Sequence, residues 1–231
     1  WFVFSVIVCI ACAWGYLRLT TPVYNISATV LIKDDKKGGG TSVSSELERM
    51  GLDGFVSSSG NVDNEIEVLR SKSLSEEVVN NLGLFVTYMD EDELPKKELY
   101  QTSPVLVSLT PQEADKLPGR MEVAMTLQPT GVMDVQMKVG DKEYRKEFEK
   151  LPAVFPTDEG TVAFFVNNDT LSAVRPESVT KERHITAFIN RPFSVAKGYA
   201  SSLSIAPTSK TTSVVVISLK NTNPRRGRDF I

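Results

Sequence analysis

Histidine and cysteine, which serve most often as catalytic bases, nucleophiles and metal ligands, are scarce in this chain of 231 residues. The single histidine is His184, and the two cysteines, Cys9 and Cys12, both lie in an apolar run at the start of the chain. One histidine is too few for a site with several histidine ligands, and nothing in the sequence marks it as the base of a catalytic triad. The Cys-x-x-Cys spacing also occurs in redox sites, but those normally accompany a βαβ pattern. We interpret His184 as a structural or surface residue.

Two further stretches are rich in glycine or acid but do not match a known binding loop. The sequence GGGTS at residues 38–42 lacks the Gly-Lys-Ser/Thr ending of a P-loop. The sequence MDEDELPKKE at residues 89–98 does not have the spacing of an EF-hand, so we interpret it as a solvated loop or a helix start. No pair of carboxylates is placed in a way that indicates a glycosidase. We therefore predict no catalytic residue, no cofactor and no metal, and we expect this segment not to be an enzyme.

A basic cluster near the end of the chain is a candidate contact site. Arg225, Arg226 and Arg228 follow Asn223-Pro224, which predicts a helix start with the asparagine as cap. Positive charge is mildly unfavourable at that end of a helix. Two interpretations stay open: the arginines are solvated, or they contact a neighbouring subunit or an anionic glycan.

Composition limits the class of protein. Hydrophobic residues make up 41% of the chain and charged residues 24%, which allows a sizeable core in one large domain or two small ones. The formal net charge is -3, from 26 basic and 29 acidic residues. A nearly neutral chain argues against a nucleic-acid binder built on a basic face, so we predict no nucleic-acid partner.

The first 17 residues, WFVFSVIVCIACAWGYL, contain no charged side chain. Trp14, Tyr16 and Arg18 are typical of the interfacial end of a membrane span, although the run is slightly shorter than the roughly 20 residues that a span needs. A secretory signal peptide fits the residues around Trp14 poorly, and a lipoprotein signal using Cys12 lacks the usual leucine-led box. We predict a first transmembrane helix over residues 1–18. The chain has no initiator methionine, so we expect it to be a fragment.

The stretch DNEIEVLRSKSLSEEVVNNLGL, residues 63–84, predicts two helices with a break between them. Asp63 or Asn64 can cap the first helix. Ser73 and Glu76 have the spacing of a capping box, which predicts the start of the second helix. We interpret the pair as an amphipathic packing element with a polar outer side.

Strand patterns occupy most of the remaining chain. Apolar residues alternate over residues 24–32, which predicts a strand. Short extended runs separated by turn signals make residues 103–167 mostly β, and we interpret them as a small antiparallel module inserted into another domain. The continuous apolar run at residues 214–217 predicts a central strand over residues 213–221. A short helical connector is expected over residues 194–199.

These elements predict an α+β fold: a membrane-anchored mixed α/β base domain with an inserted antiparallel β module, leading into a long helix that is truncated at Ile231. The expected divisions are the transmembrane helix (1–18), the first part of the base domain (19–102), the β-rich module (103–167), the second part of the base domain (168–223) and the start of the long helix (224–231).

The order of these segments resembles the envelope domain of Wzz-type chain-length determinants, the polysaccharide co-polymerases. The resemblance covers roughly residues 1–86 and 184–231. The matching residues are Asn64, Glu65, Leu69, Ser71, Ser73, Val78 and Leu82 in the first segment, and Leu219, Asn221, Pro224 and Arg226 in the second. Gly227 stands where the family usually has alanine. The β-rich stretch is similar to the larger insert of the branch that is linked to a tyrosine kinase or an exporter.

The resemblance implies a protein of the bacterial inner membrane whose base domain faces the periplasm. It implies a homo-oligomer that sets the length of capsular or exopolysaccharide as a scaffold, with a polysaccharide polymerase, an outer-membrane export protein and the growing polysaccharide as partners. A tyrosine autokinase in the kinase-fused branch would lie outside this segment. An alternative is a glycan-sensing envelope domain that signals to a cytoplasmic kinase. The residues that we predict at the interface between protomers are Glu65, Arg70, Lys72, Arg225 and Arg226.

Overall fold

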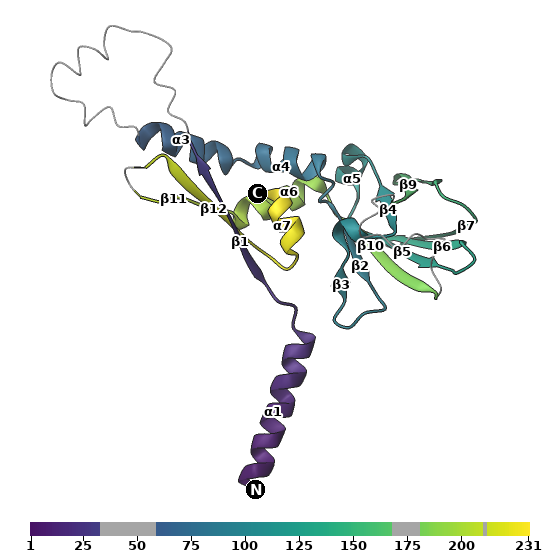
Figure 1. Ribbon diagram of the computed structural model, residues 1–231. Coiled ribbons are helices and arrows are strands. Elements are labelled where there is room, and N and C mark those ends of the chain that lie inside the picture. The colour runs from purple at the N-terminus through teal and green to yellow at the C-terminus, as the bar shows by residue number, and fades with distance from the viewer. Residues whose placement is uncertain (33–58, 168–180, 210–211) are drawn as a thin grey trace, which may run out of the picture.

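The computed structural model describes residues 1–32, 59–167, 181–209 and 212–231. A helix at the N-terminus, α1 (Phe2–Leu19), extends away from the rest of the chain, and a base unit and a β-rich unit lie side by side beyond it (Figure 1). The strand β1 (Tyr24–Leu31) leads from α1 into the base unit.

The base unit is built on a three-stranded antiparallel sheet in the order β1-β12-β11. The strand β12 (Val214–Asn221) lies in the middle, which confirms the central strand predicted for this segment, and β11 (Ser204–Pro207) lies at one edge. Alternate side chains of β12, at Val215, Ile217 and Leu219, are buried. One face of the central strand therefore contributes to the core.

Four helices pack around this sheet and beside the β-rich unit (Figure 1). They are α3 (Ser59–Leu69), α4 (Lys72–Asn81), α6 (Pro192–Ser202) and α7 (Pro224–Phe230). The helix α6 confirms the connector expected near residues 194–199, and α7 starts where Asn223-Pro224 predicted a helix. Apolar side chains of α3, β11 and β12 form a small cluster: Val62, Ile66, Ile205, Val215 and Ile217.

The break between α3 and α4 confirms the predicted pair of helices, but both predicted caps were wrong. Asp63 and Asn64 lie inside α3, which begins at residue 59. The cap of α4 is Ser71 and not Ser73, because Ser71 has an extended backbone and its Oγ accepts a hydrogen bond from the backbone N–H of Leu74 at 3.2 Å. The second helix therefore starts two residues earlier than the capping-box spacing indicated.

This assignment predicts different effects for the two serines. We expect Ser71→Ala to lower the free energy of unfolding by about 1 kcal/mol, because the N–H of Leu74 loses its partner. The matched control is Ser73→Ala, which places a better helix former at an exposed position inside α4 and should be neutral or slightly stabilising. Urea unfolding followed by circular dichroism measures both. Equal losses for the two variants would contradict the assigned cap.

The β-rich unit contains two antiparallel sheets. The larger has the strand order β3-β2-β10-β5-β6-β7, and the smaller has the order β4-β9-β8. The strands of the larger sheet are β2 (Val86–Asp90), β3 (Lys97–Glu98), β5 (Met121–Leu127), β6 (Met133–Val139), β7 (Lys142–Phe148) and β10 (Arg183–Ile189). Those of the smaller sheet are β4 (Val105–Ser108), β8 (Ala153–Thr157) and β9 (Gly160–Val166).

The larger sheet joins parts of the chain that the sequence analysis kept separate. The strand β10 pairs with β2 on one side and with β5 on the other, and both β2 and β10 lie outside residues 103–167. The β-rich unit therefore extends past the predicted module on both sides. A continuous core of buried apolar side chains, including Phe164, Met125, Ile185 and Leu219, runs from this unit into the base.

Two short helices complete the described structure: α5 (Pro111–Lys116) and the 3₁₀ turn η1 (Tyr100–Thr102). No helix in the described parts of the chain is long and apolar enough to cross a membrane.

Candidate functional site: the Arg226 junction

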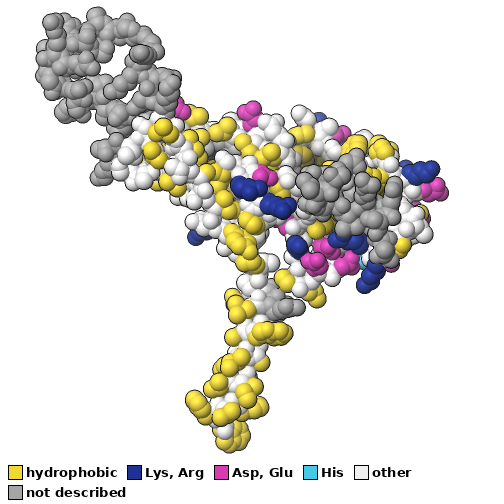
Figure 2. All heavy atoms as spheres, viewed as in Figure 1, with side chains coloured by type: hydrophobic (Ala, Val, Ile, Leu, Met, Phe, Trp, Pro, Cys, Tyr) yellow, Lys and Arg dark blue, Asp and Glu magenta, His cyan; other side chains and the backbone are white. Residues whose placement is uncertain are grey.

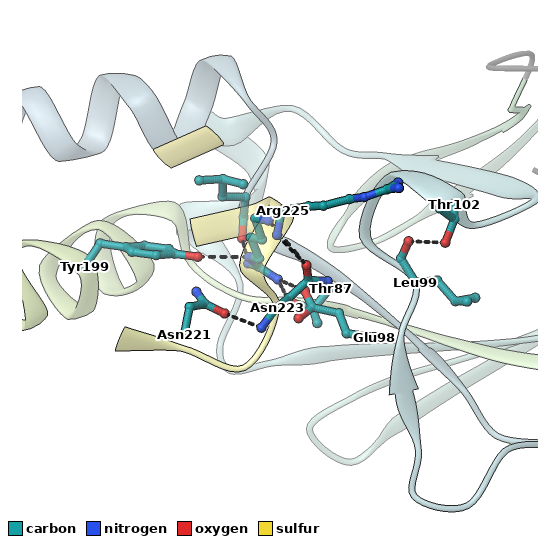
Figure 3. Close-up of polar contacts among 10 residues, drawn as sticks. Thr87, Glu98, Leu99, Thr102, Tyr199, Asn221, Asn223 and Arg225 are labelled. Atoms are coloured by element: carbon teal, nitrogen blue, oxygen red, sulfur yellow. Dashed lines mark hydrogen bonds and ion pairs between the residues drawn. The ribbon is translucent and has the colours of Figure 1, made fainter. Parts of the chain in front are cut away.

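A buried arginine joins the base unit to the β-rich unit. Arg226 lies in the first turn of α7, and only 7% of its surface is exposed. Partners of its guanidinium group come from α6, β2, β3 and the turn after α4 (Figure 3). We call Arg226 and its four partners Leu84, Thr87, Glu98 and Tyr199 the Arg226 junction.

Every nitrogen of the guanidinium group has a partner. The Nε atom donates to the hydroxyl of Tyr199 at 2.9 Å, and Nη2 donates to the backbone carbonyl of Leu84. The Nη1 atom donates to Oγ1 of Thr87 at 2.7 Å and to Oε1 of Glu98 at 2.5 Å. Because the planar fork holds its donors in fixed directions, these bonds fix the position of α7 relative to the other elements.

The junction keeps its charge although it is buried. Burial opposes the charged form of Arg226, but Tyr199 and the carboxylate of Glu98 outweigh this effect and raise the pKa of the guanidinium group above its usual value. Next to it, burial and the carboxylate of Asp229 raise the pKa of Tyr100 to about 12. Removing either member of a buried ion pair leaves the other unpaired, which costs more than the pair itself contributes.

The turn before α7 places Arg226. Oδ1 of Asn221 accepts from the N–H of Asn223 at 2.8 Å, and Oδ1 of Asn223 accepts from the N–H groups of Arg225 and Arg226 at 3.1 and 3.3 Å. Asn223 is therefore the helix cap that the sequence predicted. The ring of Phe230 stacks on Tyr199 with centroids 4.1 Å apart, which holds the other end of α7.

Gly227 follows Arg226 and is buried against β1 and β12. A Cβ atom at this position would overlap Cδ1 of Ile26 and would lie 3.1 Å from Cβ of Asn221. A residue with a side chain therefore cannot be accommodated here without a shift in its neighbours. The glycine lets α7 approach the sheet closely enough for Arg226 to reach Glu98.

The structure separates the five residues predicted at a protomer interface. Glu65, Lys72 and Arg225 are exposed, and Figure 3 shows Arg225 pointing away from the Arg226 junction. Arg70 is also exposed, and its Nη2 atom donates to the carbonyl of Ile205 in β11 at 2.7 Å.

For Arg226 the interface prediction was wrong, because its guanidinium group is buried among partners from its own chain. The alternative of a solvated side chain was wrong for the same reason. The basic cluster thus divides into one internal arginine and two exposed ones, Arg225 and Arg228.

The charge run at residues 89–98 is less solvated than the sequence indicated. Asp90 is 2% exposed and pairs with Arg183 of β10 at 2.7 Å, while Glu98 belongs to the Arg226 junction. His184 is at the surface, as predicted, where Nδ1 lies 3.0 Å from Oδ1 of Asp92. Backbone and side-chain hydrogen bonds from His184 lower the pKa of Asp92, although burial acts in the opposite direction.

No group of three or more histidine, cysteine, aspartate or glutamate side chains in the described residues is arranged to hold a metal ion. The GGGTS stretch at residues 38–42 lies outside the described residues. The chemistry of the junction, an ion pair whose donors and acceptors find their partners within the chain, is that of a structural connection.

Sequence reasoning did not single out Leu84, Thr87, Glu98 or Tyr199. Glu98 and Arg226 are separated by 128 positions, and nothing in either local pattern indicates the other. The available signal was the mild conflict between an arginine and the N-terminal end of a helix, which a buried carboxylate resolves.

Residues 1–82 match the family model Wzz, chain length determinant protein. The comparison with curated proteins found no match. The matched segment contains α1, β1, α3 and α4, so it supplies an edge of the base sheet and the helices packed on it.

The rest of the base unit comes from the far end of the chain. Register pairs run from Tyr24 with Asn221 to Leu31 with Val214, so the Wzz-matching segment and residues 214–221 form one sheet. The four residues that carry the second part of the resemblance have structural roles at this point. Leu219 is buried, Asn221 and Pro224 shape the turn, and Arg226 forms the junction.

Proposed function

We propose that this chain is the periplasmic part of an inner-membrane polysaccharide co-polymerase, which controls the chain length and export of capsular or exopolysaccharide as an oligomeric scaffold. The observation that carries the proposal is the match of residues 1–82 to the chain length determinant family. The proposed partners are further copies of the chain, a polysaccharide polymerase, an outer-membrane export protein and the growing polysaccharide.

The Arg226 junction supports a scaffold role. It fixes the β-rich unit to the base unit through α7, so that a movement of one unit is transmitted to the other. A scaffold needs such a fixed connection. The location at the inner membrane rests on the uncharged run at residues 1–17 and not on helix length. Extraction of the full-length protein with carbonate tests it, since release into the soluble fraction would contradict it.

The proposal includes the branch of the family that is fused to a tyrosine kinase, because of the β-rich unit between β1 and β12. Reading the gene beyond Ile231 tests this part. A second apolar span followed by a Gly-Lys-Ser/Thr loop is the expected result, and their absence from the gene would contradict it.

The main experiment is the length distribution of surface polysaccharide on a gel. We expect deletion of the full-length gene to abolish long polymer or to smear its modal length, and we expect the restored gene to recover it. Charge reversal at Glu65 and Lys72, which are exposed near the α3–α4 break, should alter both oligomer size and modal length. The control is Lys150→Glu in an exposed turn of the β-rich unit, which should change neither. An unchanged distribution in the deletion strain would contradict the proposal.

A second candidate is a glycan-sensing envelope domain that signals to a cytoplasmic kinase. The observation that favours it is a hollow of about 440 Å³ on the larger sheet, lined by polar side chains that include Glu122, Gln136, Glu143 and Arg145. Saturable binding of the cell's own polysaccharide at this hollow, lost in Gln136→Ala and without formation of oligomers, would favour the sensor over the scaffold.

A further inference from the structure

We propose that copies of this chain associate head to tail, with one face of the base sheet in each copy packed on the helix α3 of the next copy. The described helices of the base unit pack on the other face of that sheet. Val215 and Ile217 of β12 cluster with residues of α3, and Ile26 of β1 contacts Gly227 of α7. The opposite face, which points away from these helices, is the one that we assign to the neighbouring copy, and we call it the open face.

The register identifies the side chains of the open face. Cross-strand pairing places Thr29 and Ala206 on either side of Val216, and it places Leu31 beside Val214. The residues of the two outer strands are exposed, whereas most of those in the central strand are half-buried. The full set is Asn25, Ser27, Thr29 and Leu31 of β1, Ser204 and Ala206 of β11, and Val214, Val216, Ser218 and Lys220 of β12.

The end of the open face that lies farthest from α1 is apolar. Leu31 is 70% exposed, and Val214 and Val216 lie next to it on the same face. A sheet face that carries apolar side chains is normally covered by another layer of secondary structure. Within the described residues no such layer covers Leu31. This end of the face is therefore suited to a helix from another molecule.

The helix α3 has an outer side that matches this surface. Ile66 faces the sheet, and residues two positions away from it lie on the opposite side of the helix, because a turn takes about 3.6 residues. These residues are Asn64 and Val68. Val68 is 57% exposed, so an apolar side chain lies in the middle of an otherwise polar helix side.

The two surfaces lie at the same level along the central strand. Because α3 packs over Val215 and Ile217, its outer side is level with Val214 and Val216 of the open face. A second copy displaced straight across the sheet therefore places its apolar strand residues against Val68. Both contact surfaces lie on opposite sides of one base unit, so each copy can contact two neighbours.

Charge favours this pairing of unlike surfaces. Asp63, Glu65 and Glu67 are exposed on α3, and the carboxylates of Asp63 and Glu65 have no partner among the described residues. The open face has a single charged residue, Lys220, whose ammonium group is also unpaired within the described chain. Two α3 helices facing each other would bring like charges together, whereas the head-to-tail contact brings opposite charges together.

The arrangement keeps every N-terminal helix at the same end of the assembly. The helix α1 leads into β1 (Figure 1), and a displacement across the sheet is perpendicular to that strand. Copies related by rotation about an axis along β1 therefore all direct α1 to one side, where one membrane can hold them. A head-to-tail contact repeated in this way forms a ring if the rotation closes. The inference deepens the proposed function and rests on it for the shared membrane and for the expectation that copies associate.

The first test is disulfide cross-linking of the 231-residue chain in mild detergent. Cys9 and Cys12 of α1 are exposed, so both are first replaced by alanine. Val68→Cys and Val216→Cys in the same chain should then give a ladder of covalent dimers, trimers and larger species on oxidation. Each variant alone should give no covalent dimer, because a head-to-tail contact brings unlike positions together. A one-to-one mixture of the two single variants should stop at the dimer.

A change of charge sign tests the open face independently. Thr29 is exposed in the middle of this face, beside Val216. Thr29→Glu should weaken association about tenfold or more, because the acidic side of α3 in the next copy repels it. The matched control is Thr29→Lys, which should not weaken association. Sedimentation of both variants over a range of protein concentrations measures the effect.

Three results would overturn the proposal. The first is the absence of cross-linked species from the variant with both cysteines, and the second is a covalent dimer of either single variant, which indicates a twofold contact. The third is an equal effect of glutamate and lysine at Thr29. These measurements use purified protein, so their failure leaves the chain-length proposal untouched. An unchanged polymer length in the deletion strain would contradict the proposed function and leave the cross-linked ladder as evidence for the contact.

Discussion

Replacing Arg226 by alanine should lower the free energy of unfolding by about 3–5 kcal/mol, the usual cost of breaking a buried ion pair. The carboxylate of Glu98, whose side chain is only 15% exposed, would lose its cation. The carbonyl of Leu84 and the hydroxyls of Thr87 and Tyr199 would lose their donor at the same time. Because whole domains are stable by about 5–15 kcal/mol, this single change should leave the protein marginally folded.

Urea unfolding measures this effect. Both tryptophans, Trp1 and Trp14, lie at or in α1 and not in the base unit, so circular dichroism is a better probe than tryptophan fluorescence. The matched control is Arg225→Ala, one residue earlier and exposed, which should change stability by no more than about 0.5 kcal/mol.

Two further variants separate the ion pair from its geometry. Arg226→Lys keeps the charge but loses the fork, so it should be intermediate, since lysine cannot reach Tyr199, Glu98 and Leu84 together. The double variant Arg226→Met with Glu98→Leu removes both charges and should recover part of the loss. If Arg226→Ala unfolds at the same urea concentration as Arg225→Ala, the arginine does not have the connecting role that we assign to it.

The sequence predicted those elements whose signal lies within a few neighbouring residues. The alternation over residues 24–32 predicted β1, and the apolar run at residues 214–217 predicted β12. Both signals are local, because the pattern of apolar residues along a strand reflects which of its faces are buried. The cap at Asn223 was predicted for the same reason, as its partners are the next two N–H groups.

Pairing between distant segments was not predicted. The sequence did not show that β10 lies between β2 and β5, because the residues of a strand do not indicate which distant strands will pair with it. The predicted module at residues 103–167 was too short for this reason. The predicted cap of α4 was wrong for a different reason. Ser71 and Ser73 are two positions apart, and which of them caps the helix depends on which has an extended backbone.

The candidate site shows the same division. The sequence identified Arg226 as unusual, since three arginines near the start of a helix are unfavourable, but it gave no reason to separate Arg226 from Arg225. Arg226 differs from Arg225 because it lies on the buried side of α7, where it meets Glu98, a residue 128 positions away in the sequence. Among the residues predicted at an interface, four are exposed and remain candidates: Glu65, Arg70, Lys72 and Arg225.

Gly227 is the position where a change that is favourable for the helix should be unfavourable for the protein. Alanine favours a helix over glycine by up to about 1 kcal/mol. At Gly227, however, the added Cβ would overlap Cδ1 of Ile26 and crowd Asn221, so the side chain of Ile26 must turn away or α7 must move from the sheet. We expect Gly227→Ala to destabilise the protein by about 1–3 kcal/mol, the usual cost of overpacking.

The control is Gly198→Ala in α6, where no atom lies within 4 Å of the added Cβ. That variant should be stabilised, because only the helix preference changes. Urea unfolding of both variants should therefore show shifts of opposite sign. Equal shifts would contradict the close packing of α7 against β1.

A compensating change tests whether Ile26 is the obstacle. Ile26→Val removes Cδ1 and should alone cost about 0.5–1.5 kcal/mol. Combined with Gly227→Ala it should cost less than the sum of the two changes, because the new methyl group fills the space that Cδ1 leaves. Strict additivity would mean that the strain lies at Asn221 instead. If displacement of α7 draws Arg226 away from Glu98, Glu98→Gln should cost less in the Gly227→Ala variant than in the unaltered protein. An unchanged cost would mean that the close approach of α7 to the sheet is not what brings the ion pair together.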